Sequence, residues 1–323
     1  MNIVIISYIY PKKINPSQGV YIHQQAKYLA RLGNCVDIIT TKSYGDREDE
    51  IRDNVTIHRV SVHKAAAARE FHKLDPKSSG FLFSMNTIKK LFELNRKKGI
   101  DLILGQFLGS STIIIGLFAK LMGKKFIVVS HGTGWELPKK SKIKNFLIRL
   151  ALSIPYKIVC VSKKTRELLS YNADASKLFV IHNGMDPEYL SPSKSKGQFK
   201  RQLKISGKQV ILSVSNLIGK KGIATIIKSI SRLVKNSQNI IYLIVGDGVD
   251  REKLENLVKE LNLGKFVRFE GKKVGSELAD YYNICDMFVL MSRDVEEGIE
   301  SFGIGYIEAA YFGKPVIAGA SGG

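Results

Sequence analysis

The 323 residues exceed what one ordinary hydrophobic core holds, and a composition of 44% hydrophobic and 24% charged residues excludes a disordered chain. The net charge is +21, yet no helix-turn-helix, RNA-recognition or zinc pattern accompanies it, which disfavours a nucleic-acid-binding protein. Cys35, Cys160 and Cys285 are far apart and lack a CxxC spacing. We therefore expect buried, reduced thiols of a cytoplasmic protein.

The first part of the chain alternates short β-branched runs with amphipathic segments, which is typical of a parallel sheet covered by helices. The predicted strands are 2–7, 35–41, 55–60, 101–106, 125–132, 156–162 and 178–184, and the predicted helices are 18–33, 111–122, 142–153 and 163–171. The first run lacks the basic region and long apolar core of a secretion signal.

Residues 102–119 carry no charge and are long enough for a tilted membrane span. Gln106 and the Gly-Ser-Ser-Thr at 109–112 interrupt this run. We interpret the segment as a strand, a loop with a helix cap, and an apolar helix.

A drop in apolar content at 191–207 indicates a linker, after which the alternation restarts. The predicted strands are 209–216, 240–248, 265–271, 287–292 and 314–319, and helices are expected at 222–235, 250–261, 275–283 and from about 303 onward. The sequence thus predicts two doubly wound α/β domains, 1–190 and 208–323, with a ligand-binding cleft between them at the carboxyl ends of the strands.

The basic excess is concentrated in the first domain, at 87–99 and 138–152. In 138–152, Ile143, Phe146, Leu147 and Leu150 form an apolar stripe beside several lysines. Such a helix binds anionic membrane surfaces, but an ordinary solvated helix face has the same pattern, and both interpretations stay open.

In the second domain, Lys220 and Lys221 precede Gly222 and a helix. Free N–H groups, the helix dipole and a lysine together favour an anion such as phosphate, although a Lys-Gly helix entry also occurs without one. The sequence contains neither GxGxxG nor a P-loop.

Two carboxylates, Glu300 and Glu308, lie in an otherwise small and apolar stretch. A helix that begins near 303–305 places Glu300 in the preceding loop and Glu308 one turn inside the helix. Carboxylates accept from sugar hydroxyls, so beside an anion site they suggest a sugar-phosphate ligand. The alternative for Glu308 is an early-helix acid stabilised by the dipole.

The stretch "ESFGIGYIEAAYFGKPVIAG…SGG" from residue 300 resembles the Glu-x7-Glu signature of the family-4 retaining glycosyltransferases. Other segments match in the order of that family: "SYIYP…QGVYIHQQAKYLARLG", "VVSHG", "IVCVS", "VIHNGMD", "SVSNLIGKKG" and "IVGDG". The resemblance spans nearly the whole chain and implies the GT-B fold of two facing Rossmann-like domains.

The resemblance implies roles for the second-domain residues. Lys221 would neutralise the diphosphate of a nucleotide-sugar donor, and Glu308 would accept from the ribose hydroxyls. Glu300, with the backbone amides of Phe302 and Gly303, would face the transferred sugar and its phosphate.

Further roles follow from the same resemblance. His131 would contact a hydroxyl of the transferred sugar, although alone it reads as a structural histidine, and Gly19 would allow a close approach to the diphosphate. The nucleotide base would rest near Val274. The family often has arginine at the position of Asn216, so Lys220 is a candidate to replace that phosphate contact.

The resulting hypothesis is a retaining transferase that uses a UDP- or GDP-linked sugar and a glycan or lipid-linked acceptor, with no metal and no cofactor. A looser resemblance to capsule, teichuronic acid and O-antigen enzymes suggests bacterial surface polysaccharide synthesis at the cytoplasmic membrane face. The sequence ends inside the "SGG" motif, so we expect a shortened second domain and leave its activity open. The alternatives are a GT-B nucleotide-sugar epimerase and a noncatalytic binder.

Overall fold

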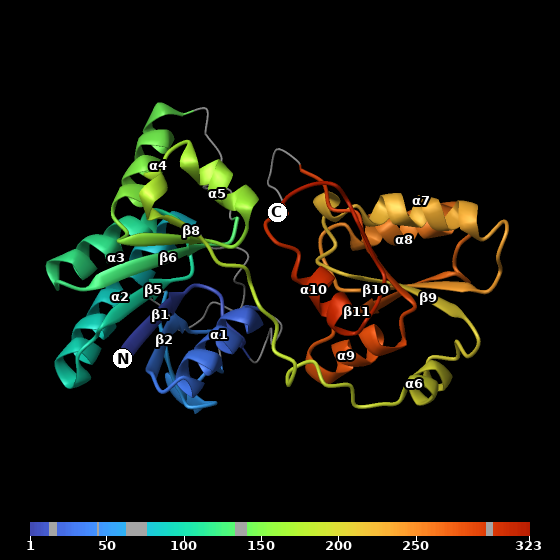
Figure 1. Cartoon of the computed structure of the whole chain (residues 1–323), viewed down its shortest axis with the longest axis horizontal. Helices are drawn as coiled ribbons and strands as arrows, with labels where there is room; N and C mark the ends of the chain where they lie inside the picture. Colours follow the sequence, from blue (N-terminus) through green and yellow to red (C-terminus); the bar gives the residue numbers. More distant parts are fainter. Residues whose placement is uncertain (13–17, 44, 63–75, 133–140, 295–299) are drawn as a thin grey trace. The chain divides into compact units, whose positions relative to one another are not determined.

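The computed structural model describes the chain except residues 13–17, 44, 63–75, 133–140 and 295–299 (Figure 1). It divides into two compact units, Met1–Asn183 and Gly184–Gly323. Each unit is an α/β domain of Rossmann type, built on a mainly parallel sheet as the alternating pattern predicts.

The sheet of the first unit has the strand order β3-β4-β2-β1-β5-β6-β7-β8. All pairings are parallel except β3 with β4. The central strand β1 is almost wholly buried, which explains its unbroken apolar sequence. The strands are β1 (Asn2–Ser7), β2 (Cys35–Thr41), β3 (Asp49–Arg52), β4 (Val55–Val60), β5 (Leu102–Gly105), β6 (Lys125–Ser130), β7 (Lys157–Cys160) and β8 (Leu178–Val180).

Helices cover this sheet, and α2, α3 and α4 pack in sequence against one another (Figure 1). The helices are α1 (Val20–Arg31), α2 (Pro76–Lys98), α3 (Ser110–Leu121), α4 (Lys142–Ser153) and α5 (Lys163–Ser170). The sequence predicts each of these except α2, of which only the basic segment 87–99 stands out, and it also misses β3.

The uncharged run at 102–119 is β5 followed by α3, as interpreted from the sequence. The N–H of Gly109 donates to Thr112 Oγ1 over 3.0 Å, so the threonine of the predicted cap does satisfy a free backbone donor. Among the described residues, no helix is long and apolar enough to cross a membrane.

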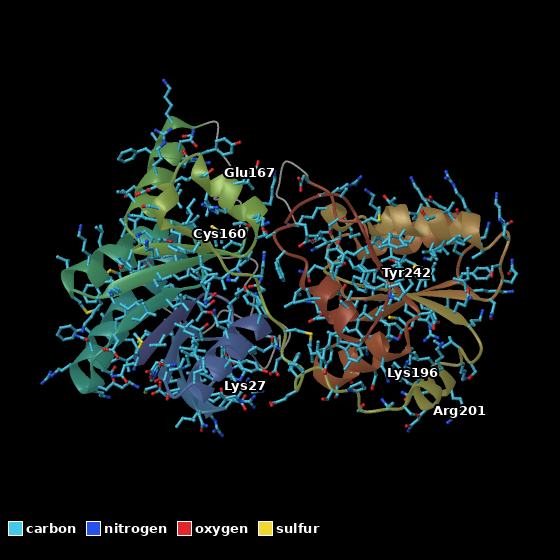
Figure 2. All side chains as sticks on the ribbon, viewed as in Figure 1. Lys27, Cys160, Glu167, Lys196, Arg201 and Tyr242 are labelled. Atoms are coloured by element: carbon cyan, nitrogen blue, oxygen red, sulfur yellow. The ribbon has the colours of Figure 1, made fainter. Side chains whose placement is uncertain are left out.

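All three cysteines are free thiols. Cys160 and Cys285 are buried, and Figure 2 labels Cys160 within the first unit. The prediction for Cys35 is wrong, because this thiol at the start of β2 is exposed.

The second unit has a parallel sheet with the strand order β11-β10-β9-β12-β13. Its strands are β9 (Gln209–Val214), β10 (Ile240–Val245), β11 (Val267–Gly271), β12 (Met287–Leu290) and β13 (Val316–Ala318), and its helices are α6 (Lys196–Gln202), α7 (Ile223–Leu233), α8 (Arg251–Glu260), α9 (Gly275–Ile284) and α10 (Ile304–Tyr311). Tyr242 of β10 is fully buried at the centre of this core (Figure 2).

The segment 191–207, expected as a linker, contains α6 and packs on the second unit. Phe199 and Ile205 are buried in the core of that unit. The carboxylate of Asp280 in α9 accepts from the backbone N–H groups of Ser193 and Lys194 and from the Ser193 hydroxyl, at 2.8 to 3.0 Å. The segment is therefore held by hydrogen bonds as well as by apolar contacts.

We predict that Asp280→Ala lowers the free energy of unfolding by roughly 2–4 kcal/mol, because it leaves partly buried backbone donors without an acceptor. Urea unfolding followed by circular dichroism measures the change. Glu260→Ala, at an exposed carboxylate near the end of α8, is the matched control and should change stability by less than about 0.5 kcal/mol. Equal stabilities of the two variants would show that Asp280 does not hold the segment.

Candidate functional site

The second unit brings the predicted residues together where the strand order reverses. Strands β9 and β12 are neighbours, with Phe288 opposite Leu212, but the chain leaves β9 toward β10 and leaves β12 toward β13. Two connections that depart in opposite directions leave a crevice at the carboxyl ends of the strands, where ligands of open α/β sheets bind. Lys221 follows β9 and Glu300 follows β12, so both belong to this point.

An ion pair joins the two: Lys221 Nζ contacts Glu300 Oε2. The hydroxyl of Ser292, just after β12, donates to the same carboxylate oxygen over 2.8 Å. Glu300 is only 8% exposed, and a charge so deeply placed is stabilised by a partner such as this ammonium. The site thus contains the Lys221 ammonium group, and an incoming anion could replace the Glu300 carboxylate as its partner.

Glycine is required at the turn that presents Lys221. Gly222 has φ +68°, and a Cβ there would lie 2.0 Å from the carbonyl oxygen of Met291. The close approach joins the short 3₁₀ helix η3 (Gly219–Lys221) to the end of β12. The N–H of Arg293 adds a 2.8 Å hydrogen bond to the carbonyl oxygen of Lys220. These contacts fix the position of Lys221 beside Glu300.

The helix behind the two acids begins where the sequence predicts. Gly303, with φ +77°, is the residue before α10, so Glu300 lies in the preceding loop and Glu308 lies inside the helix. The last residues of the chain support the loop, since the N–H of Gly323 donates to the Glu300 carbonyl oxygen over 2.8 Å. Gly322 packs against the same carbonyl, with no room for a Cβ.

Glu308 has a different environment from Glu300. The buried hydroxyl of Tyr282 in α9 donates to Glu308 Oε2 over 2.7 Å. Burial raises the pKa of Glu308 above its ordinary value, and the hydrogen bond from Tyr282 only partly offsets this. A dipole-stabilised acid at a helix start would show a lowered pKa, so desolvation, rather than the helix terminus, dominates at Glu308.

The remaining predicted residues of this unit lie around the same edge of the sheet. Asn216 is exposed two residues after β9, and Val274 is the extended residue before α9. Phe302 lies in the loop between Glu300 and α10. Among the described residues, no cluster of three or more His, Cys, Asp or Glu side chains is placed to hold a metal ion.

The first unit has its own reversal point, at β1 and β5. Gly19 precedes α1 with φ +73°, and a Cβ there would lie 2.9 Å from the Ile9 carbonyl oxygen, so only glycine fits this tight turn. His131 follows β6, and its Nε2 lies 2.8 Å from Oε1 of Gln106, which follows β5. Burial lowers the pKa of His131 to about 4, so the imidazole is neutral at physiological pH.

Sequence reasoning missed three polar partners of these residues: Ser292, Tyr282 and Gln106. Each partner is identified only by a tertiary contact with Glu300, Glu308 or His131. The one available signal was that Ser292 and Gln106 are the last residues of predicted strands, where ligand-binding residues of such sheets lie.

Comparison with known families and proteins agrees with this geometry. Residues 18–189 match the family described as Glycosyltransferase Family 4, and residues 195–323 match Glycosyl transferases group 1. The chain is 27% identical to the 2-deoxystreptamine N-acetyl-D-glucosaminyltransferase of Niallia circulans, over 94% of this chain and 80% of that protein.

Another relative is the GDP-mannose-dependent alpha-(1-6)-phosphatidylinositol monomannoside mannosyltransferase of Mycolicibacterium smegmatis, which is 26% identical over 65% of this chain and 56% of its own length. Among solved structures, Anabaena HepE in complex with UDP and glucose superposes with a TM-score of 0.75 at 18% identity, covering 100% of this chain and 82% of HepE. The fold is therefore GT-B.

We predict that Gly222→Ala destabilises the second unit by about 3 kcal/mol, because the new methyl group meets a backbone oxygen in a left-handed conformation. Gly219→Ala is the control, since its Cβ would have no neighbour nearer than 3.7 Å. Thermal and urea unfolding of the two variants measure the difference. Equal losses in both would mean that the approach of η3 to β12 does not constrain the turn.

Proposed function

The chain belongs to glycosyltransferase family 4 and is a nucleotide-sugar-dependent glycosyltransferase, from which we propose a more specific activity. We propose that it transfers a sugar, with retention of configuration, from a UDP- or GDP-linked donor to a glycan or lipid-linked acceptor of a bacterial surface polysaccharide. The observation that carries this proposal is the Lys221–Glu300 pair at the reversal point of the second sheet.

Lys221 has the position and charge to hold the donor diphosphate. When the diphosphate arrives, its oxygens compete with Glu300 for the ammonium group, and the new contact is a charge-assisted hydrogen bond. As the bond between the sugar and the phosphate breaks, negative charge grows on the leaving phosphate, and Lys221 stabilises that charge. We propose that this lysine, without a metal or a cofactor, provides the neutralisation.

Glu300 then serves the transferred sugar. Once Lys221 turns to the diphosphate, the carboxylate is available to accept from sugar hydroxyls, while Ser292 keeps it in place. The backbone N–H groups of Phe302 and Gly303 would bind the sugar-linked phosphate at the start of α10. Glu308, oriented by Tyr282, would accept from the ribose hydroxyls.

The resemblance suggests further contacts for residues of each unit. His131 would accept from a hydroxyl of the transferred sugar, and the turn at Gly19 would admit the diphosphate to backbone N–H groups. The base would lie against Val274. Asn216 and Lys220 would provide the outer phosphate contacts.

The chemistry follows from these contacts. The acceptor hydroxyl oxygen bonds to the anomeric carbon on the face from which the phosphate leaves, so the configuration is retained. The bond from that carbon to the phosphate oxygen breaks, and the hydroxyl proton passes to the departing phosphate. No side chain has to act as the base.

A lipid-linked acceptor is supported by the surface of the first unit. The helices α2, α3 and α4 pack in sequence, and together they contain ten Lys or Arg residues against one acid, Glu93. Large apolar side chains are exposed among these charges: Phe81, Met85, Phe92, Leu117, Leu121, Ile143, Phe146 and Leu147. Exposed apolar groups within a cationic surface match the acyl boundary and headgroups of an anionic membrane. We propose that this surface binds the inner face of the plasma membrane.

We predict that Lys221→Ala lowers the transfer rate by at least about 100-fold and weakens nucleotide diphosphate binding, since the leaving charge is no longer stabilised. Glu300→Gln should reduce transfer similarly but keep or tighten nucleotide binding, because it removes the competing carboxylate. Donor turnover with panels of UDP- and GDP-sugars, and calorimetry with UDP and GDP, measure the two effects.

Lys228→Ala, at an exposed residue of α7, is the control and should behave as the unchanged chain does. Transfer should also persist in a metal chelator. Unaltered transfer in both site variants would contradict the assignment. Formation of an epimerised sugar without any acceptor would show that the chain is an epimerase and not a transferase.

For the membrane surface, we predict binding to vesicles that contain anionic lipid and release at high salt, because exposed charges are screened. The double variant Ile143→Ser and Phe146→Ser should bind at least roughly tenfold more weakly, since two exposed apolar side chains are removed. The control pairs Ile51→Ser with Val249→Ser, which are exposed apolar residues outside the three helices. Co-sedimentation measures binding, and equal binding to neutral vesicles would argue against the proposal.

A further inference from the structure

A short chain of hydrogen bonds ends at His131. Gln106 Oε1 lies 2.8 Å from His131 Nε2, and Gln106 Nε2 donates to Gln25 Oε1 over 2.5 Å. The three residues come from the segment after β6, the segment after β5, and α1. They meet at the carboxyl ends of the central strands, where the family resemblance places the sugar.

The direction of each bond follows from the amide atom of Gln25 that faces Gln106. In the structure this atom is Oε1, which can only accept, so Gln106 presents its NH₂ group to it. The oxygen of Gln106 then faces His131, and His131 Nε2 must carry the hydrogen that this oxygen accepts. In a neutral imidazole only one nitrogen is protonated, which leaves Nδ1 with a lone pair.

The central member of the chain is held firmly. Gln106 is 5% exposed, and its backbone N–H donates to the carbonyl oxygen of Ile6 over 2.8 Å. The ring of Tyr21 lies beside the imidazole, with 5.0 Å between the ring centroids. Rotation of the Gln106 amide would set NH₂ against N–H at His131 and oxygen against oxygen at Gln25. While Gln25 Oε1 faces it, the Gln106 amide therefore has one favourable orientation.

We propose that Gln106 is a positioning residue that keeps the proton of His131 on Nε2, so that Nδ1 accepts a hydrogen bond from a hydroxyl of the transferred sugar. The hydroxyl partner rests on the proposed function, whereas the tautomer does not. With the proton on Nδ1, or on both nitrogens, His131 would donate to the sugar instead of accepting. Gln106 thus determines which hydrogen-bonding group the sugar meets.

Nuclear magnetic resonance of the full chain with ¹⁵N-labelled histidine tests the tautomer without any assay of activity. His131→Ala identifies the signal among the six histidines. We expect the Nε2-protonated form in the unchanged chain, a mixture of tautomers in Gln106→Leu, and an intermediate state in Gln25→Leu. Gln24→Leu, on the same helix, is the control and should leave the signal unchanged. A proton on Nδ1 in the unchanged chain, or an unchanged tautomer in both Gln106→Leu and Gln25→Leu, would overturn the proposal.

Transfer kinetics test the consequence. Gln106→Leu should raise the KM for the donor roughly tenfold, the equivalent of one hydrogen bond. Gln106→Glu places a carboxylate against Nε2 and raises the pKa of His131, so activity should fall as the pH drops through that raised value. The unchanged chain should lack this acidic limb, because its His131 titrates near 4. Tautomers as expected together with unaffected kinetics would support the role of Gln106 and refute the sugar contact of His131.

Discussion

The charge contact between Lys221 and Glu300 is the constraint on which the second unit's site depends. It requires β9 and β12 to be neighbours, a glycine at 222 in contact with the Met291 carbonyl, and Glu300 in the segment before α10. A largely buried carboxylate without its ammonium would be strongly unfavourable. The same pair therefore compensates the buried carboxylate and provides the cation that a bound diphosphate would contact.

The two acids of the Glu-x7-Glu signature differ because their surroundings differ. Glu300 has an ammonium and a hydroxyl on one oxygen, whereas Glu308 accepts from the Tyr282 hydroxyl and has a pKa that burial raises. Because their environments differ, the two glutamates are suited to separate roles rather than to one acid/base pair. Glu300 is suited to exchange its contact with Lys221 for contacts with sugar hydroxyls. Glu308 is suited to accept hydrogen bonds in one fixed orientation.

The alternating apolar runs were sufficient to predict both sheets and most helices, and the ordered motifs selected Lys221, Glu300 and Glu308 as candidates. Helix α2 was missed because it starts with Pro-Lys-Ser-Ser-Gly, which has low helix propensity, and is stabilised by packing against α3. Strand β3 was also missed, because its sequence is polar and the strand is stabilised by pairing with β4. Local sequence patterns likewise could not predict three polar partners, because each contacts a site residue that is distant in sequence: Ser292, Tyr282 and Gln106.

The two units supply different electrostatics at the carboxyl ends of their strands. At its reversal point the second unit has the ammonium group of Lys221, which attracts anions through its net charge. The first unit places a desolvated, neutral imidazole, which an amide holds in orientation. A diphosphate needs a cation, but a sugar hydroxyl gains more from an oriented lone pair than from another positive charge.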